Sequence, residues 1–198
     1  MESVALGFRM HSGWGVLVAV SGAADSVAVV DRRRIIVTDP SAPGGNQPYH
    51  FAANLPANDC EEFIAKCRDR TERMAFAAIK ESLRELQQRK FRVTSAAVLM
   101  ASGRALPSLP QILASHPLIH TAEGEFFRKA VITACGKLDI PATPVREREI
   151  EELARSAYGR KAASVSRKIS TVGASIGPPW TADHKAAALA ALMTLKNS

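Results

Sequence analysis

The chain has 198 residues, of which 46% are hydrophobic and 23% charged. This composition is typical of a globular protein and excludes extensive disorder. A single hydrophobic core can serve a chain of this length, so we expect one domain over residues 1–198. The formal net charge of +7 favours polyanionic partners such as nucleic acid or acidic ligands.

No segment has the pattern of a membrane span or a signal peptide. The longest apolar run, residues 186–193, is shorter than the roughly 20 residues that cross a bilayer. The three cysteines are odd in number and lack CxxC spacing, which indicates reduced thiols. The sequence therefore predicts a cytoplasmic protein without a membrane segment.

Residues 4–39 contain short, β-branched apolar runs separated by small, turn-forming residues. The runs VALGF, WGVLVAV and SVAVV with RRRIIVT alternate with the breaks HSG and SGAAD. This pattern predicts three antiparallel strands joined by tight turns.

Residues 39–58 form a long segment with four prolines, two glycines and no helical or strand period. Loops of this length inside a domain are usually functional or disordered. The aromatic side chains of Tyr49 and Phe51 favour an ordered loop, because they give the segment apolar surface to bury.

The remainder of the chain alternates helices with two short strands. Asp59 and Glu62 have the spacing of a helix capping box, and apolar residues at three- and four-residue spacing extend this helix to Leu86. Residues 93–100 predict a central strand, 117–137 a helix, 142–147 a short strand and 147–159 another helix. A basic segment, residues 160–180, precedes a last helix from about Thr181. We expect an α/β fold with a mixed five-stranded sheet flanked by helices.

The two ends of the chain carry a resemblance to a known superfamily. The N-terminal pair of strands, VALGFRMHSGWGVLVAV, and the C-terminal segment TADHKAAALAAL resemble the first strands and last helix of RNase H-like domains. The resemblance is greatest to the Holliday-junction-resolvase (RuvC-like) branch, and the order of elements agrees with it. It implies an RNase H-like fold and a nucleic-acid-directed function.

The resemblance also implies where a catalytic site would lie. Enzymes of this fold hold two divalent ions with carboxylates on the first strand, at the end of the central strand and on the last helix. Here only Asp183 remains at a matching position, since no acid occurs in residues 3–24 or 91–122. Arg9, Arg104 and Lys185 would instead make the inherited site attractive to anions, with His184 beside them; the alternative is that these basic residues are separate surface charges.

Five histidines supply further candidates for chemistry. His11 belongs to the N-terminal motif, whereas His116, His120 and Glu123 have HxxxHxxE spacing, which places them on one face of a helix. They are candidate catalytic groups together with Asp183, and the two imidazoles with the carboxylate are also candidate ligands of zinc or another transition metal. Ordinary hydrogen-bonded roles are the alternative. We expect Glu125 to face solvent.

Three functions fit these observations. The first is a nucleic-acid-directed protein of RuvC-like descent, either a phosphodiester hydrolase with an altered site, using Mg²⁺, Mn²⁺ or Zn²⁺, or a non-cleaving binder. The second is a small-molecule enzyme or binding protein in which His50, His116 and His120 meet Arg9, His11 and Lys185 around an anion. The third is an inactive scaffold, which predicts an exposed apolar patch and no convergent polar cluster.

Overall fold

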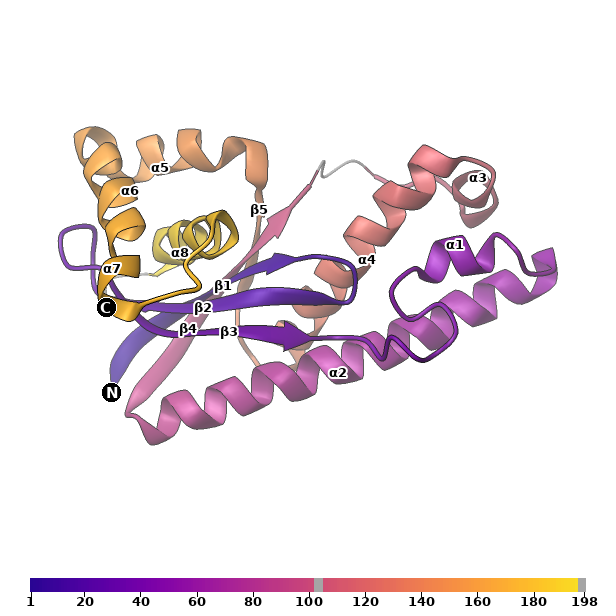
Figure 1. Cartoon of the computed structure of the whole chain (residues 1–198), viewed down its shortest axis with the longest axis horizontal. Coiled ribbons are helices and arrows are strands. Elements are labelled where there is room, and N and C mark those ends of the chain that lie inside the picture. Colours follow the sequence, from indigo (N-terminus) through magenta and orange to yellow (C-terminus); the bar gives the residue numbers. More distant parts are fainter. Residues whose placement is uncertain (102–104, 196–198) are drawn as a thin grey trace.

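A mixed five-stranded sheet forms the centre of the computed structural model, which describes residues 1–101 and 105–195 (Figure 1). The strand order is β3-β2-β1-β4-β5. The strands are β1 (Glu2–Met10), β2 (Trp14–Ser21), β3 (Ala28–Ile36), β4 (Phe91–Met100) and β5 (Ala142–Arg146). The first three are antiparallel, whereas β4 pairs in parallel with both β1 and β5. The predicted mixed α/β sheet is confirmed.

Helices cover both faces of this sheet (Figure 1). One face and its extension carry α1 (Pro48–Ala52), α2 (Cys60–Gln88), α3 (Leu109–Leu113) and α4 (His116–Lys137). The other face carries α5 (Ile150–Tyr158), α6 (Ala162–Thr171), α7 (Gly173–Ile176) and α8 (Ala182–Thr194). Each side has its own buried apolar cluster. Among the described residues, no helix has the length and apolar character needed to cross a bilayer.

The alternation of β1 assigns its side chains to these two clusters. Leu6 and Phe8 pack toward α2 and α4, whereas Ala5 packs toward α8. Gly7 shares the α8 face, and a Cβ atom on it would lie 1.9 Å from the carbonyl oxygen of Ala187. The backbones of β1 and α8 are therefore in direct contact, which only glycine permits at this position.

Residues 39–58 are more regular than their sequence predicts, because they contain α1. Tyr49 makes an edge contact with Phe126 of α4, and Phe51 stacks on Phe63 of α2. These aromatic contacts dock the segment, as expected from its composition. The capping box at Asp59 is absent: Asp59 makes no side-chain cap hydrogen bond, and the carboxylate of Glu62 pairs with Lys66.

Arg32 of β3 fixes the chain that leads into α8. Its guanidinium donates hydrogen bonds of 2.5–3.0 Å to four successive carbonyl groups, those of residues 176–179. The indole N–H of Trp180 donates a further bond of 2.8 Å to the carbonyl of Ile169. The first turn of α8 is thereby attached to both the sheet and α6.

The two outer strands have different sequences but both are poor surfaces for further strand pairing. β3 carries four successive charged residues, 31–34, and β5 is only five residues long and contains Pro144. Arg33 of β3 forms ion pairs with Asp31 and with Glu85 of α2. The sheet thus ends in charge on one side and in a proline-containing strand on the other.

We predict that Gly7→Ala lowers the free energy of unfolding by about 3 kcal/mol, because the new methyl group forces α8 away from β1. Urea denaturation followed by circular dichroism measures this change. Gly136→Ala in α4 is the control: beyond its chain neighbours and the nearby backbone of its own helix, nothing lies within 4 Å of the added Cβ, so stability should stay equal or rise by up to about 1 kcal/mol. Equal stability of both variants would contradict the close contact.

Candidate functional site

The carboxyl ends of β1, β4 and β5 lie at one edge of the sheet, because these strands are parallel. Arg9 shares the face of Gly7, so it projects toward α8. Asp183 lies one helical turn before Ala187, the residue that contacts Gly7. Glu147 directly follows β5. The fold therefore brings Arg9, Asp183 and Glu147 together from three distant segments.

Arg9 bridges the two carboxylates. Its Nη1 lies 3.0 Å from Oδ1 of Asp183, and its Nη2 and Nε lie 2.8 and 3.1 Å from Oε1 of Glu147. The Nε2 of His11 lies 2.8 Å from Oδ2 of Asp183. Both oxygens of Asp183 thus face nitrogen atoms of the protein, and one guanidinium is shared by two acids.

A second guanidinium, that of Arg128, lies behind this group at the end of β4. It donates hydrogen bonds to the carbonyls of Leu99, at 3.0 Å, and of Gly124. Burial lowers the pKa of Arg128, an effect that the charges of Glu125 and Glu147 oppose and that of Arg9 reinforces. Two guanidinium groups, those of Arg9 and Arg128, thus lie among three carboxylates, those of Asp183, Glu147 and Glu125.

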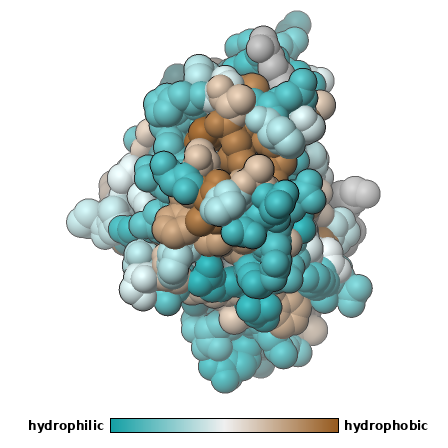
Figure 2. Space-filling view, turned by 90° about the vertical axis from the view of Figure 1, so that its right-hand side faces the viewer, coloured by the Kyte–Doolittle hydropathy of each residue, from teal (hydrophilic) through white to brown (hydrophobic). Residues whose placement is uncertain are grey.

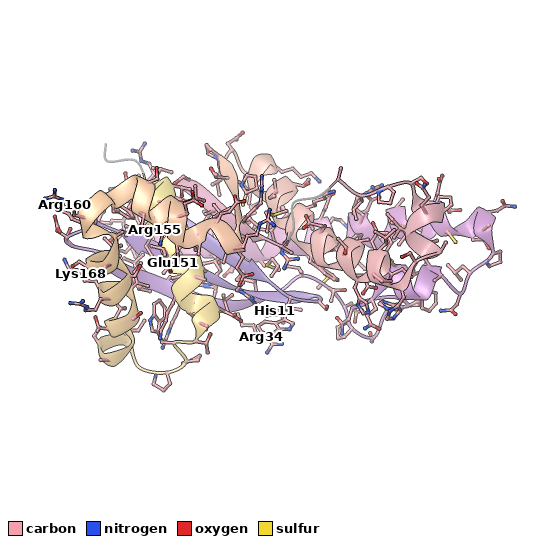
Figure 3. All side chains as sticks on the ribbon, turned by 90° about the horizontal axis from the view of Figure 1, so that it is seen from above. His11, Arg34, Glu151, Arg155, Arg160 and Lys168 are labelled. Atoms are coloured by element: carbon pink, nitrogen blue, oxygen red, sulfur yellow. The ribbon has the colours of Figure 1, made fainter. Side chains whose placement is uncertain are left out.

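The two tryptophans of the chain both have partners within the protein. His11 stacks on Trp14 with ring centroids 4.3 Å apart, and the guanidinium of Arg34 lies 3.9 Å from the centroid of the Trp14 ring. Figure 3 shows His11 and Arg34 close together beside the sheet. Trp180 packs in the cluster beneath α8. Trp14 thus extends the site, whereas Trp180 stabilises the fold.

His184 does not fit the expected role as an anion contact, because it is buried, with 6% of its surface exposed. Its Nδ1 lies 2.8 Å from the hydroxyl of Thr181, closing the capping box that begins α8. Burial lowers the pKa of His184, the charge of Arg32 acts in the same direction, and Asp183 opposes both. His184 therefore has a structural role at the start of α8.

The other predicted basic residues do not surround Arg9. Lys185 is half-buried and lines a shallow hollow with Trp180. Arg104 lies outside the described residues. Arg9 itself is paired with two acids, so its charge is largely compensated. This differs from the expected anion-attracting pocket, and the physical reason is Glu147, which was not among the predicted site residues.

A second polar cluster lies between α1 and the start of α4. The rings of His50, His116 and His120 contact one another, with centroids 4.4–5.4 Å apart. Glu123 is buried beside His50 rather than among the other two rings. Within residues 1–101 and 105–195, no hydrogen bond, ion pair or ring contact joins this cluster to Arg9, His11 or Lys185.

Glu125, expected to face solvent, is instead buried, with 4% of its surface exposed. α4 contacts α1, α2, α3 and three strands, so it has buried residues around most of its circumference. A helix in such surroundings has no broad solvent face. The charge of Glu125 acts to raise the pKa of Arg128, while its own Oε1 is buried and has no hydrogen-bond partner among the described residues.

An apolar hollow lies at the end of the molecule that carries α1 and α3 (Figure 2). A cavity of about 550 Å³ at this end is lined by residues that include Ala52, Leu55, Leu109 and Leu113. The scaffold hypothesis predicts such a patch together with no convergent polar cluster. Its second prediction is wrong, because the described residues form the two polar clusters above.

Comparison with known proteins identifies the fold. No family model matches the chain, and no curated protein has a significant match to it. RuvC of Thermus thermophilus in complex with a Holliday junction substrate is 13% identical, with a TM-score of 0.53 over 96% of this chain and 91% of that chain. A second Thermus thermophilus RuvC structure has the same identity and coverage and a TM-score of 0.49. A Ppx/GppA family member from Aquifex aeolicus has a TM-score of 0.34 and 13% identity over 81% and 40% of the two chains.

The first of these comparisons confirms the predicted RNase H-like, RuvC-like fold. Sequence reasoning placed Arg9, His11 and Asp183 at one end of the sheet, and the structure joins them by direct contacts. It missed Glu147 and Arg128. The signal that could have found Glu147 was an acid directly after a short strand, since ligands in α/β sheets gather at the carboxyl ends of parallel strands.

We predict that the pH dependence of stability contains a contribution from His184. Because its pKa is lowered in the folded state, the stabilisation is present above the unfolded value of about 6.5 and is lost as pH falls through the folded pKa. His184→Gln keeps the capping-box acceptor without titrating. Between pH 7.5 and 5, the melting temperature of the wild type should therefore fall further than that of the variant; parallel curves would argue against this role.

We also predict a favourable interaction between Arg9 and Glu147. In a double-mutant cycle with Arg9→Met and Glu147→Gln, denaturant unfolding should give a coupling energy of about 1 kcal/mol, limited by solvent screening because the Glu147 side chain is 39% exposed. Arg9→Met alone should be the more damaging single change, since it also leaves Asp183 without its guanidinium partner. A coupling of zero would mean that the observed pair does not contribute to stability.

Proposed function

We propose that the protein binds nucleic acid without cleaving it by the two-metal mechanism of its fold. The observation that carries the proposal is the ion pairing of Arg9 with both Asp183 and Glu147. Both acids at this site are already paired with a cation of the protein itself.

Two-metal hydrolysis needs several carboxylate oxygens free to coordinate divalent ions. Here an entering ion would have to displace the Arg9 guanidinium from two acids and approach Arg128 as well. β1 has no acid beyond Glu2 at its opposite end, and β4 has none at all. The charge arrangement therefore opposes binding of a metal pair, while it leaves the fold intact.

The charge distribution favours α5 and α6 as the surface that meets nucleic acid. Between residues 150 and 182 the chain has five basic residues and two acidic ones, Glu151 and Glu152 in the first turn of α5. Figure 3 shows Arg155, Arg160 and Lys168 together at this end of the molecule. Lys161 and Lys168 contact Asp25, whereas Arg155, Arg160 and Arg167 are exposed and form no ion pair within the described part of the chain. Unpaired cations on one surface attract a phosphate backbone.

α2, on the opposite face of the sheet, provides a contrast. It contains six acidic and six basic residues, so its formal net charge is zero. Several of these charges form ion pairs, such as Lys66 with Glu62 and Arg84 with Glu81. Residues 150–182 therefore carry more net positive charge than α2 does, which favours their side of the sheet for a polyanion.

The structural similarity supports nucleic acid as the partner and a branched DNA as the first ligand to test. The compared RuvC structure contains a Holliday junction substrate, and its fold extends over 96% of this chain. Similar folds can hold different sites, so the binding mode rests on the charges of this chain.

We predict salt-dependent binding to a fluorescent four-way DNA junction, measured by anisotropy, with no cleavage in Mg²⁺ or Mn²⁺. The double variant Arg160→Ala/Arg167→Ala should lower the slope of log affinity against log salt by about 2, because each arginine neutralises about one phosphate. The matched control Arg73→Ala/Lys80→Ala, on α2, should retain the wild-type slope.

Two results would overturn this proposal. The absence of salt-dependent binding to junction, duplex or single-stranded DNA and RNA would exclude the binding function. Metal-dependent cleavage that Asp183→Asn abolishes would exclude the non-cleaving assignment. Equal weakening by the two double variants would show that α5 and α6 are not the binding surface.

A further inference from the structure

We propose that His50, His116 and His120 form a binding site for a divalent transition-metal ion, for which zinc is the best match. Each histidine offers one ring nitrogen, and these three atoms lie within 4.8 Å of one another. The site is separate from the group around Arg9 and does not depend on nucleic-acid binding.

The backbone positions of the three histidines follow from the fold. His116 and His120 are four residues apart at the start of α4, so they share one face of that helix. His50 lies in α1, which Tyr49 and Phe51 hold against α4 and α2. The helix period places His116 and His120 side by side, and the aromatic contacts of α1 place the imidazole of His50 next to them.

The distances are close to those of a bound ion. Zinc binds imidazole nitrogen at about 2.0–2.1 Å in tetrahedral geometry, which places the nitrogens about 3.4 Å apart. Movement of the rings by about 1 Å closes the present arrangement to that spacing. His116 and His120 are exposed, so their rings are free to rotate and a solvent molecule has access to the fourth position.

Glu123 has the place of a group that orients a metal-binding histidine. It is buried, with 5% of its surface exposed, its Oε1 accepts a hydrogen bond of 3.1 Å from the backbone N–H of His50, and its Oε2 lies 2.9 Å from the Nδ1 of His50. The last contact has the distance, though not the angle, of a hydrogen bond. A carboxylate beside Nδ1 leaves Nε2 of the same ring to bind a metal. Glu123 is therefore a positioning residue rather than a ligand.

The chemistry of the ligands selects the kind of ion. Three imidazoles suit zinc and its transition-metal neighbours, whereas Mg²⁺ and Ca²⁺ require oxygen ligands. An ion bound here would join the segment of residues 39–58 to α4. It would thereby fix a loop that is otherwise attached through aromatic packing and the hydrogen bond from His50 to Glu123.

The test is isothermal titration of zinc chloride into the full chain, prepared without a polyhistidine tag and stripped with EDTA. We expect one zinc ion per chain and no comparable heat with magnesium chloride. His116→Gln and His120→Gln, both at exposed positions, should each weaken zinc binding at least 10-fold. His184→Gln, which removes a histidine outside the cluster and keeps the α8 cap, should bind zinc as the wild type does.

A second measurement distinguishes the role of Glu123. Glu123→Gln should weaken zinc binding about 10- to 100-fold, while the stoichiometry and the visible spectrum of the cobalt-substituted protein stay those of the wild type. A changed cobalt spectrum would identify Glu123 as a ligand and overturn its positioning role. Absence of saturable zinc binding in the wild type, or wild-type affinity in both His116→Gln and His120→Gln, would overturn the site itself.

Discussion

The direct backbone contact between β1 and α8 is the constraint on which the candidate site depends. A carbonyl oxygen of α8 lies where a side chain of residue 7 would be, so the helix can pack at only one distance from the sheet. That distance also sets the separation between the first turn of α8 and the end of β1, so Asp183 contacts Arg9 and His11. The small residues of α8 serve this packing as much as they serve helix formation.

The group formed around Arg9 joins the ends of β1, β5 and α8 through charge. A guanidinium has a fixed planar set of donors, so it binds two carboxylates in one arrangement and needs no dissolved ion. Removing one half-buried member of this group would leave the charges of its partners uncompensated, so the members depend on one another for stability. Both oxygens of Asp183 and one oxygen of Glu147 thus already have partners within the protein.

Elements with a local period were predictable from the sequence, whereas contacts that depend on parallel strand pairing were missed. The hairpin, the long helices and the HxxxH face repeat at strand or helix spacing, and Arg9, His11 and Asp183 lie on those elements. Glu147 belongs to the site only because β5 pairs with β4, and the paired residues of these two strands are 46 positions apart in the sequence. His50 lies in a five-residue helix with no period of its own. Glu125 was misassigned because its neighbours on all sides come from other elements.

The two outer strands have a consequence for how the protein behaves toward copies of itself. The edge strands of an open sheet expose unpaired backbone groups, and a strand of another molecule can pair there unless the side chains of the edge strand prevent it. The charged run of β3 would place like charges opposite one another in such a pairing, and Pro144 removes a donor from β5. Both margins therefore resist growth of the sheet from molecule to molecule, even though its central strands are almost entirely apolar.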